Sequence, residues 1–166
     1  MDRPQKSCYN AAVLSVSARR VAFQTPPIEA RDPGLSKDRT MEEELRGVKV
    51  LVIDDSKTIR RSAETLLSKA GCDVITAVDG FDALAKIADS HPEIIFVDIM
   101  MPRLDGYQTC ALIKNNSEFK STPVVMLSSK DGLFDKAKGR IVGSDRYITK
   151  PFSKEELLGT IRNLVS

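Results

Sequence analysis

Residues 48–71 read VKVLVIDDSKTIRRSAETLLSKAG and contain the pattern that decides the fold. The segment opens with a near-continuous aliphatic run over 48–53, which is typical of a strand buried in a parallel sheet. Residues 56–70 follow with apolar side chains at helical spacing and end at Gly71, a common helix terminator. The segment therefore predicts a strand and helix of an α/β protein.

The same alternation continues along the chain. Further strands are predicted at 73–78, 94–97, 123–127 and 146–149, and further helices at 80–90, 106–115, 133–140 and 153–164. In the last helix Ser153 is the expected N-cap, and Glu156 lies three residues on, at capping-box spacing. Strands and helices that alternate in this way require a parallel sheet covered by helices on both faces, with right-handed crossovers.

The composition is typical of a globular protein with about one domain, since 42% of its 166 residues are hydrophobic and 29% are charged. A net charge of +2 gives no indication of a nucleic-acid partner. No apolar run approaches the ~20 residues that span a bilayer, and there is no good secretory signal. Cys8, Cys72 and Cys110 lack metal-binding spacing, and the latter two are expected to pack as small apolar residues. We expect a cytoplasmic protein with neither nucleic acid nor membrane as a partner.

Residues 1–46 are expected to form an extension to the folded segment 47–166. Residues 1–40 show no sustained period, are rich in proline, and carry seven Lys or Arg against four Asp or Glu, which favours a disordered leader. In a second interpretation Met41, which opens the acidic start MEEELRG, is the true initiator and the residues before it are not native. Both interpretations stay open.

Polar residues stand at the carboxyl ends of the predicted strands, where open α/β sheets place their ligand sites. They are Asp54, Asp55, Asp98, Ser128, Ser129, Thr149 and Lys150, and Pro151 follows the last of them. Crowded carboxylates raise one another's pKa, and a hard divalent cation such as Mg²⁺ relieves that repulsion. A metal and a lysine together form a pocket that can hold a phosphoryl group, and a carboxylate there can act as a nucleophile.

Each of these residues also has an ordinary explanation. Asp54, Asp55 and Ser56 would be a helix start in most proteins, and Lys150 with Pro151 would be a surface turn. The functional interpretation depends on their occurring together at one edge of the sheet.

Four segments resemble the receiver domain of two-component response regulators. They are VLVIDDS (50–56), IIFVDIMMPRLDGY (94–107), VVMLSSK (124–130) and YITKPF (147–152). They occur in the order and at the spacing of that family, and the resemblance covers residues 47–165. It implies a flavodoxin-like (βα)5 fold, with a doubly wound five-stranded parallel sheet in the strand order 2-1-3-4-5.

The resemblance also implies a role for each residue of the acidic site. Asp98 is expected to be the phospho-acceptor. Asp54 and Asp55 are expected to be the acidic pair that holds Mg²⁺, with Asp55 as the direct ligand. Met100 is expected to offer its backbone carbonyl to the metal.

The remaining motif residues are expected to sense the phosphoryl group. Lys150 would pair with the phosphoryl oxygens, and a cis peptide before Pro151 would aim that lysine. Ser128 would be the switch hydroxyl, and Tyr147 would be the aromatic residue that changes rotamer with it. The ordinary explanation of Tyr147 is a half-buried residue of an edge strand.

Residues 132–152 are similar to receivers of the chemotaxis-like system that controls type IV pili and twitching motility. The chain ends soon after the last predicted helix, so we expect a stand-alone receiver that is not an enzyme. It would accept a phosphoryl group from a histidine kinase. It would then bind an effector protein through helix 133–140, strand 146–149 and helix 153–164.

Three other classes of protein compete with this interpretation. An aspartyl phosphatase would need a D-x-D motif, but Ile99 and Met100 follow Asp98. A nucleotide-binding module would need a glycine-rich phosphate loop, which the sequence lacks. An interaction domain that is not phosphorylated would be expected to lack one of the pocket residues, and all of them are present.

Overall fold

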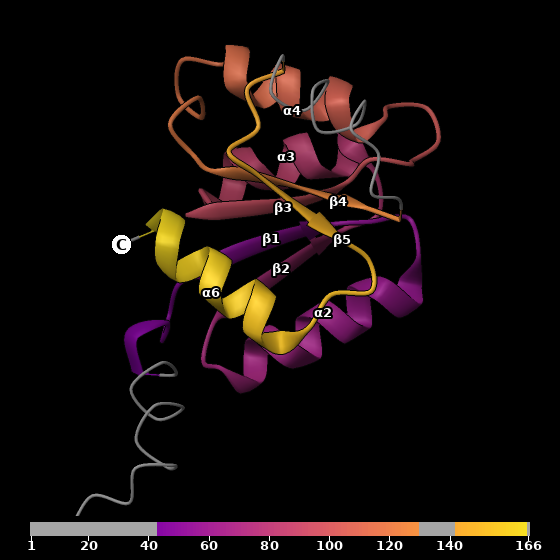
Figure 1. The fold of residues 1–166 in the computed structure, drawn as a ribbon. Helices are drawn as coiled ribbons and strands as arrows, with labels where there is room; N and C mark the ends of the chain where they lie inside the picture. The colour runs from indigo at the N-terminus through magenta and orange to yellow at the C-terminus, as the bar shows by residue number, and fades with distance from the viewer. Residues whose placement is uncertain (1–42, 130–141, 166) are drawn as a thin grey trace, which may run out of the picture. The chain divides into compact units, whose positions relative to one another are not determined.

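The computed structural model describes residues 43–129 and 142–165. Its centre is a parallel sheet of five strands in the order β2-β1-β3-β4-β5, which confirms the predicted fold class and strand order (Figure 1). The strands are β1 (Lys49–Ile53), β2 (Asp73–Ala77), β3 (Ile94–Asp98), β4 (Val124–Ser128) and β5 (Arg146–Thr149).

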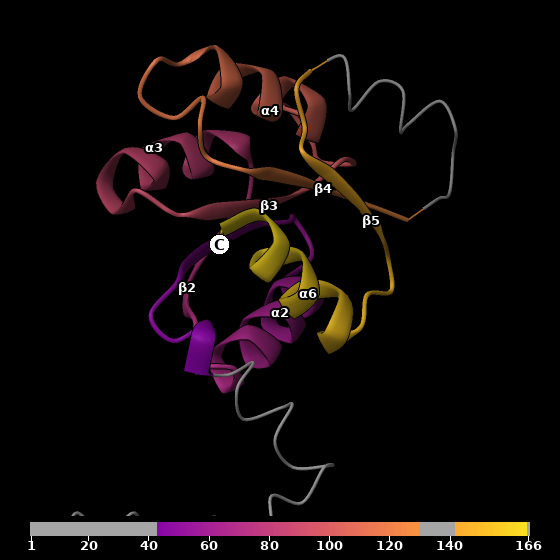
Figure 2. The ribbon, with the colours of Figure 1, turned by 60° about the vertical axis from the view of Figure 1, so that its left-hand side comes forward.

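Helices cover both faces of this sheet. They are α2 (Lys57–Lys69), α3 (Gly80–Ser90), α4 (Gly106–Asn115) and α6 (Lys154–Val165). Figures 1 and 2 show α2 and α6 on one face and α3 and α4 on the other. The predicted helix at 133–140 and residues 1–42 of the expected extension lie outside the described residues. Within the described segments, none of the helices combines the length and the apolar character needed to cross a bilayer.

The two faces of the sheet form two separate hydrophobic cores. Val50, Phe96 and Leu127 point into the core under α2 and α6. Leu51 and Val97 point into the core under α3 and α4. Alternate side chains of β1, β3 and β4 therefore enter opposite cores, so nearly every position in these strands is buried. This is why the strands appear in the sequence as continuous apolar runs.

Several predicted boundaries differ from the structure by one residue. Ser56 and Ala70, predicted to be helical, cap α2 instead, and the Ser56 hydroxyl accepts a hydrogen bond from the amide of Ile59. The predicted strand starts at Val48 and Pro123 also lie just outside β1 and β4. Before α6 the predicted capping box is confirmed, because Ser153 and Glu156 exchange two hydrogen bonds of 3.0 and 3.2 Å.

The core also includes residues outside the strands and helices. Leu45 is 3% exposed and packs in the core under α2 and α6, two residues before the expected start of the folded segment.

Cys72 and Cys110 are both buried among apolar residues, as predicted. Burial raises the pKa of each thiol to about 11, so both are protonated at neutral pH.

Gly106 fixes the distance between α4 and the end of β3. A Cβ atom on this residue would lie 2.3 Å from the backbone oxygen of Asp98 and 2.8 Å from the Cα of Ile99. The Gly106 amide donates a 3.0 Å hydrogen bond to the carbonyl of Ile99. The start of α4 therefore touches the backbone that carries Asp98, and only glycine leaves room for that contact.

We expect Gly106→Ala to lower the free energy of unfolding by roughly 1–3 kcal/mol, because the new methyl group must displace backbone. Gly159→Ala in α6 is the matched control, since a Cβ there meets nothing within 4 Å. Because alanine is the better helix former, the control should raise stability by about 0.5–1 kcal/mol. Urea denaturation of both variants measures the difference, and equal stabilities would contradict the steric explanation.

Candidate functional site

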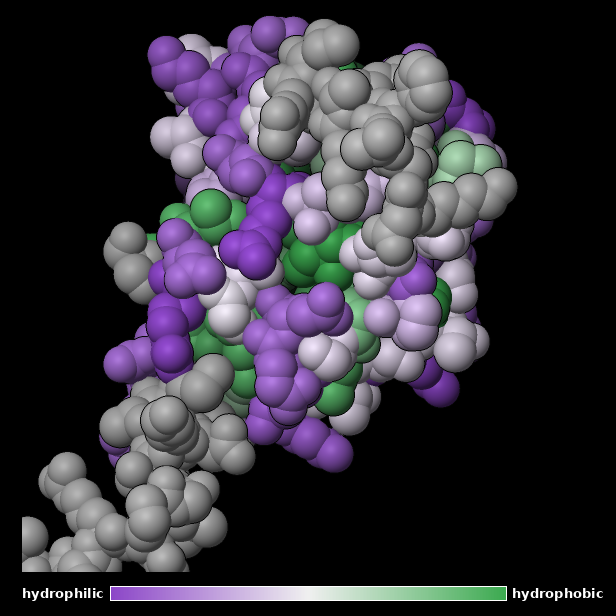
Figure 3. Space-filling model, viewed as in Figure 1, coloured by the Kyte–Doolittle hydropathy of each residue, from purple (hydrophilic) through white to green (hydrophobic). Residues whose placement is uncertain are grey.

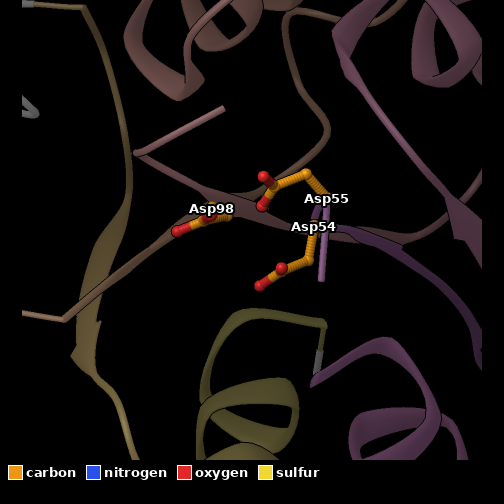
Figure 4. Close-up of side chains that lie close together, drawn as sticks. All are labelled: Asp54, Asp55 and Asp98. Carbon is orange, nitrogen blue, oxygen red and sulfur yellow. The ribbon is translucent and has the colours of Figure 1, made fainter. Parts of the chain in front are cut away.

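Three carboxylates meet at the carboxyl edge of the sheet. Asp98 is the last residue of β3, and Asp54 and Asp55 directly follow β1, which pairs with β3. One ligand oxygen from each carboxylate lies within 4.8 Å of the other two. Figure 4 shows the three side chains gathered at these two strand ends. The predicted convergence of Asp54, Asp55 and Asp98 is therefore observed.

Lys150 compensates part of this negative charge. Its Nζ atom lies 2.5 Å from Oδ2 of Asp54 and 2.9 Å from Oδ1 of Asp98. The residue directly follows β5, and its amide donates a 2.5 Å hydrogen bond to the carbonyl of Ser128. The peptide bond between Lys150 and Pro151 is cis, as predicted. One ammonium group thus bridges two carboxylates from different strands.

The two aspartates that follow β1 have different surroundings. Asp54 is completely buried, and its second oxygen, Oδ1, accepts a 2.8 Å hydrogen bond from the amide of Ser56. Each oxygen of Asp54 therefore already has a donor within the protein. Asp55 is exposed and lines a hollow of about 530 Å³ together with Met100, Asp105 and Tyr107. Of the two, Asp55 has its carboxylate open to a ligand from solvent.

Burial and neighbouring charges shift the pKa values of Asp98 and Lys150. Burial raises the pKa of Asp98, and the nearby Asp54 carboxylate raises it further, against the opposing effect of Lys150. Burial alone would lower the pKa of Lys150, but hydrogen bonds to Asp54 and Asp98 outweigh it and raise that pKa. The charged form of Asp98 is therefore disfavoured, chiefly by burial, whereas Lys150 stays protonated.

The other predicted site residues lie around this centre. Ser128 ends β4, is 4% exposed, and pairs in register with Thr149 of β5. Tyr147 is half-buried, lies beside Met126 and packs against the core under α3 and α4. Met100 is 72% exposed in the loop after Asp98, and its backbone amide bonds to the Asp98 carboxylate. Asp98 and Ser128 lie at the ends of the paired strands β3 and β4.

An ion pair that the sequence does not indicate supports the loop after Asp98. Arg103 has a left-handed backbone with φ of 66°, and its guanidinium donates to the carboxylate of Asp79. The same guanidinium lies 5.6 Å above the ring of Phe81. Asp79 is the N-cap of α3, and hydrogen bonds from the Asp82 backbone and the charge of Arg103 lower its pKa. Nothing in the local sequence indicates this contact, because its two ends belong to different loops.

We expect Asp98→Asn to raise the melting temperature at pH 7 in EDTA by roughly a few degrees. Because the folded-state pKa of Asp98 is raised, the protonated carboxyl favours folding, and that contribution is lost as the pH rises through the folded pKa. The asparagine side chain is uncharged at pH 7, like the protonated carboxyl of Asp98. The gain in melting temperature should therefore shrink in acid, where Asp98 is itself protonated.

Thermal melts at pH 7 and at acidic pH measure this change in melting temperature. Asp89→Asn is the matched control, because it removes a carboxylate from an exposed position of α3. A lower melting temperature for Asp98→Asn than for Asp89→Asn at pH 7 would show that the charged form of Asp98 does not destabilise the fold.

Known proteins that resemble this chain in sequence and structure have the fold described above. Residues 50–162 match the family described as the response regulator receiver domain. Protein PilG of Pseudomonas aeruginosa is 85% identical over 122 residues, which cover 74% of this chain and 90% of that protein.

Two solved structures have the same fold. The chemotaxis protein CheY4 of Vibrio cholerae is 36% identical, with a TM-score of 0.69 over 71% of this chain and 98% of that one. The receiver domain of sensor histidine kinase PA1611 from Pseudomonas aeruginosa PAO1, solved with magnesium in its active site cleft, is 24% identical. Its TM-score is 0.67 over 72% of this chain and 98% of that one. With the family match over most of its length, this chain belongs to the response regulator receiver domains.

Proposed function

We propose that Asp98 accepts a phosphoryl group from a histidine kinase in a Mg²⁺-dependent reaction, and that this modification changes the affinity for an effector protein. The observation that supports this proposal most strongly is the position of Lys150, whose ammonium bridges the carboxylates of Asp54 and Asp98. A cation in that place can bind the oxygens of a phosphoryl group attached to Asp98.

The donor set suits Mg²⁺. Three carboxylates with oxygens within 4.8 Å of one another provide hard oxygen ligands and leave room for water, which this ion prefers. We assign direct coordination to Asp55 and Asp98 and to the backbone carbonyl of Met100, with Asp54 close by. When bound, Mg²⁺ would neutralise charge on the phosphoryl oxygens. Magnesium in the cleft of the PA1611 receiver domain supports this assignment.

The chemistry then needs a nucleophile and a fixed cation. An oxygen of Asp98 attacks the phosphorus of a phosphohistidine, and the P–N bond breaks with its electron pair left on the imidazole. Lys150 stabilises the charge that develops on the phosphoryl oxygens. Burial raises the pKa of Asp98 most, and repulsion from Asp54, which a bound cation would relieve, raises it further. The domain would catalyse only its own phosphorylation and dephosphorylation.

The signal would pass from Asp98 to the edge of the sheet formed by β4 and β5. Ser128 is buried at the end of β4, and its carbonyl accepts a hydrogen bond from the amide of Lys150. Because the side chain of Lys150 binds Asp98, this lysine connects Asp98 to Ser128. We propose that the Ser128 hydroxyl moves to the phosphoryl group and that Tyr147 changes rotamer with it, biasing two pre-existing surfaces. Figure 3 has the same view as Figure 1, and around the place where Figure 1 draws β5 it shows hydrophobic surface flanked by hydrophilic residues.

We place the protein in a chemosensory pathway that controls type IV pili and twitching motility, acting in the cytoplasm. The support is the 85% identity with Protein PilG, together with the resemblance of residues 132–152 to twitching receivers. The effector surface would combine residues 133–140 with β5 and α6. Part of that surface lies outside the described residues.

Asp98→Asn should abolish the incorporation of acid-labile phosphate from a small phosphodonor such as acetyl phosphate. The reason is that asparagine offers no nucleophilic carboxylate, and EDTA should abolish incorporation by the unchanged protein as well. Radiolabelled phosphate retained on the protein measures both effects, and Asp89→Asn serves as the control that keeps incorporation. Labelling that survives Asp98→Asn would refute the assignment of the acceptor.

Ser128→Ala should still accept phosphate on Asp98 but should lose phosphate-dependent capture of the effector, because the hydroxyl that senses the phosphoryl group is gone. Pull-downs with and without beryllofluoride, a phosphoryl mimic, test this. Ser129→Ala, at the exposed neighbouring residue, is the matched control. Capture that responds equally to the mimic in both variants would exclude Ser128 as the switch.

A further inference from the structure

Arg60 holds the backbone that carries the acidic pair. Its Nη1 atom donates to the carbonyl of Asp54 at 2.6 Å and to the carbonyl of Asp55 at 3.0 Å. We propose that Arg60 is a positioning residue for divalent-cation binding, which acts by fixing the direction of the Asp55 carboxylate. This inference rests on the proposed Mg²⁺-dependent function.

The turn from Asp54 to Ser56 is held by bonds on both of its sides. On one side, Oδ1 of Asp54 accepts a 2.8 Å hydrogen bond from the amide of Ser56. On the other side, Arg60 binds the two carbonyls that precede Ser56. Arg60 is itself anchored in α2, because its amide donates a 3.0 Å hydrogen bond to the carbonyl of Ser56. The guanidinium therefore ties the turn to the first turn of the helix.

Asp55 is the member of the acidic cluster that needs such support. Asp54 and Asp98 are buried and bound to Lys150, whereas Asp55 is exposed. Repulsion from Asp54 and Asp98 favours rotation of the Asp55 carboxylate away from the cluster when no cation is bound. Charge-assisted bonds from a guanidinium to consecutive carbonyls fix the backbone on which that carboxylate stands.

Arg60 also lies where its charge reaches α3. Its charge lowers the pKa of Asp82, although the larger influences there are burial, which raises that pKa, and bonds from Lys86 and the Val78 backbone, which lower it. Partners that orient metal ligands without touching the metal typically affect metal affinity about 10–100-fold.

The experiment compares Arg60→Gln, Arg60→Lys and Arg61→Gln in the full chain. Arg61→Gln is the matched control, because it removes the same charge from the adjacent exposed position of α2. Isothermal titration calorimetry with MgCl₂ measures the dissociation constant, and thermal melts in EDTA measure stability.

We expect Arg60→Gln to weaken Mg²⁺ binding about tenfold, with a melting temperature close to that of Arg61→Gln. Arg60→Lys should recover part of the affinity, since an ammonium can bind one of the two carbonyls. Phosphate incorporation by Arg60→Gln should return to the wild-type rate at saturating MgCl₂. An unchanged dissociation constant, or a loss of stability that accounts for the whole effect, would overturn the inference.

A second measurement separates this inference from the proposed function. In EDTA, hydrogen exchange at the amide of Ser56 should be faster in Arg60→Gln than in Arg61→Gln, because the turn loses its brace. If the wild-type protein itself failed to bind Mg²⁺, the proposed function would be wrong. Equal exchange at Ser56 in the two variants would instead show that Arg60 does not hold the turn.

Discussion

The contact of the Lys150 ammonium with the carboxylates of Asp54 and Asp98 is the interaction on which the rest of the site depends. Both carboxylates are buried, and a buried charge without a partner costs several kcal/mol or more. Lys150 reaches them from the end of β5, although their strands β1 and β3 are not adjacent to it in the sheet. The ion pairs therefore connect the end of the edge strand to the centre of the sheet, and one ammonium leaves part of the negative charge of the three carboxylates uncompensated.

Three cationic side chains support the acidic edge in different ways. Lys150 contacts the carboxylates themselves, Arg60 binds the backbone that precedes α2, and Arg103 braces the loop after Asp98 through Asp79. Gly106 adds a steric limit, since α4 touches the Asp98 backbone. These contacts hold the Asp54 and Asp98 carboxylates and the backbone around them in place, so a ligand that binds these two residues requires little reorganisation.

The same arrangement connects chemistry to a surface. The amide of Lys150 donates a hydrogen bond to the carbonyl of Ser128, and its side chain binds Asp98, so one residue contacts both Asp98 and the end of β4. Tyr147 lies three residues before it on the same edge strand. A change of charge at Asp98 thus acts directly on the strand pair β4 and β5, and β5 is the edge strand of the sheet in the described part of the chain.

The residue pattern was enough to predict the succession of strands and helices along the described part of the chain, the burial of the sheet on both faces, and the acidic and basic residues at its carboxyl edge. These follow from local apolar periods and from the rule that parallel strands present their ends together. Sequence motifs also indicated Asp54, Asp55, Asp98 and Lys150 together. The folded protein was needed to show which oxygen each donor binds, that Arg103 pairs with Asp79, and that Arg60 binds the carbonyls of the turn before α2. Those contacts join residues whose local patterns are compatible with many partners, and only the packing of loops against one another selects among them.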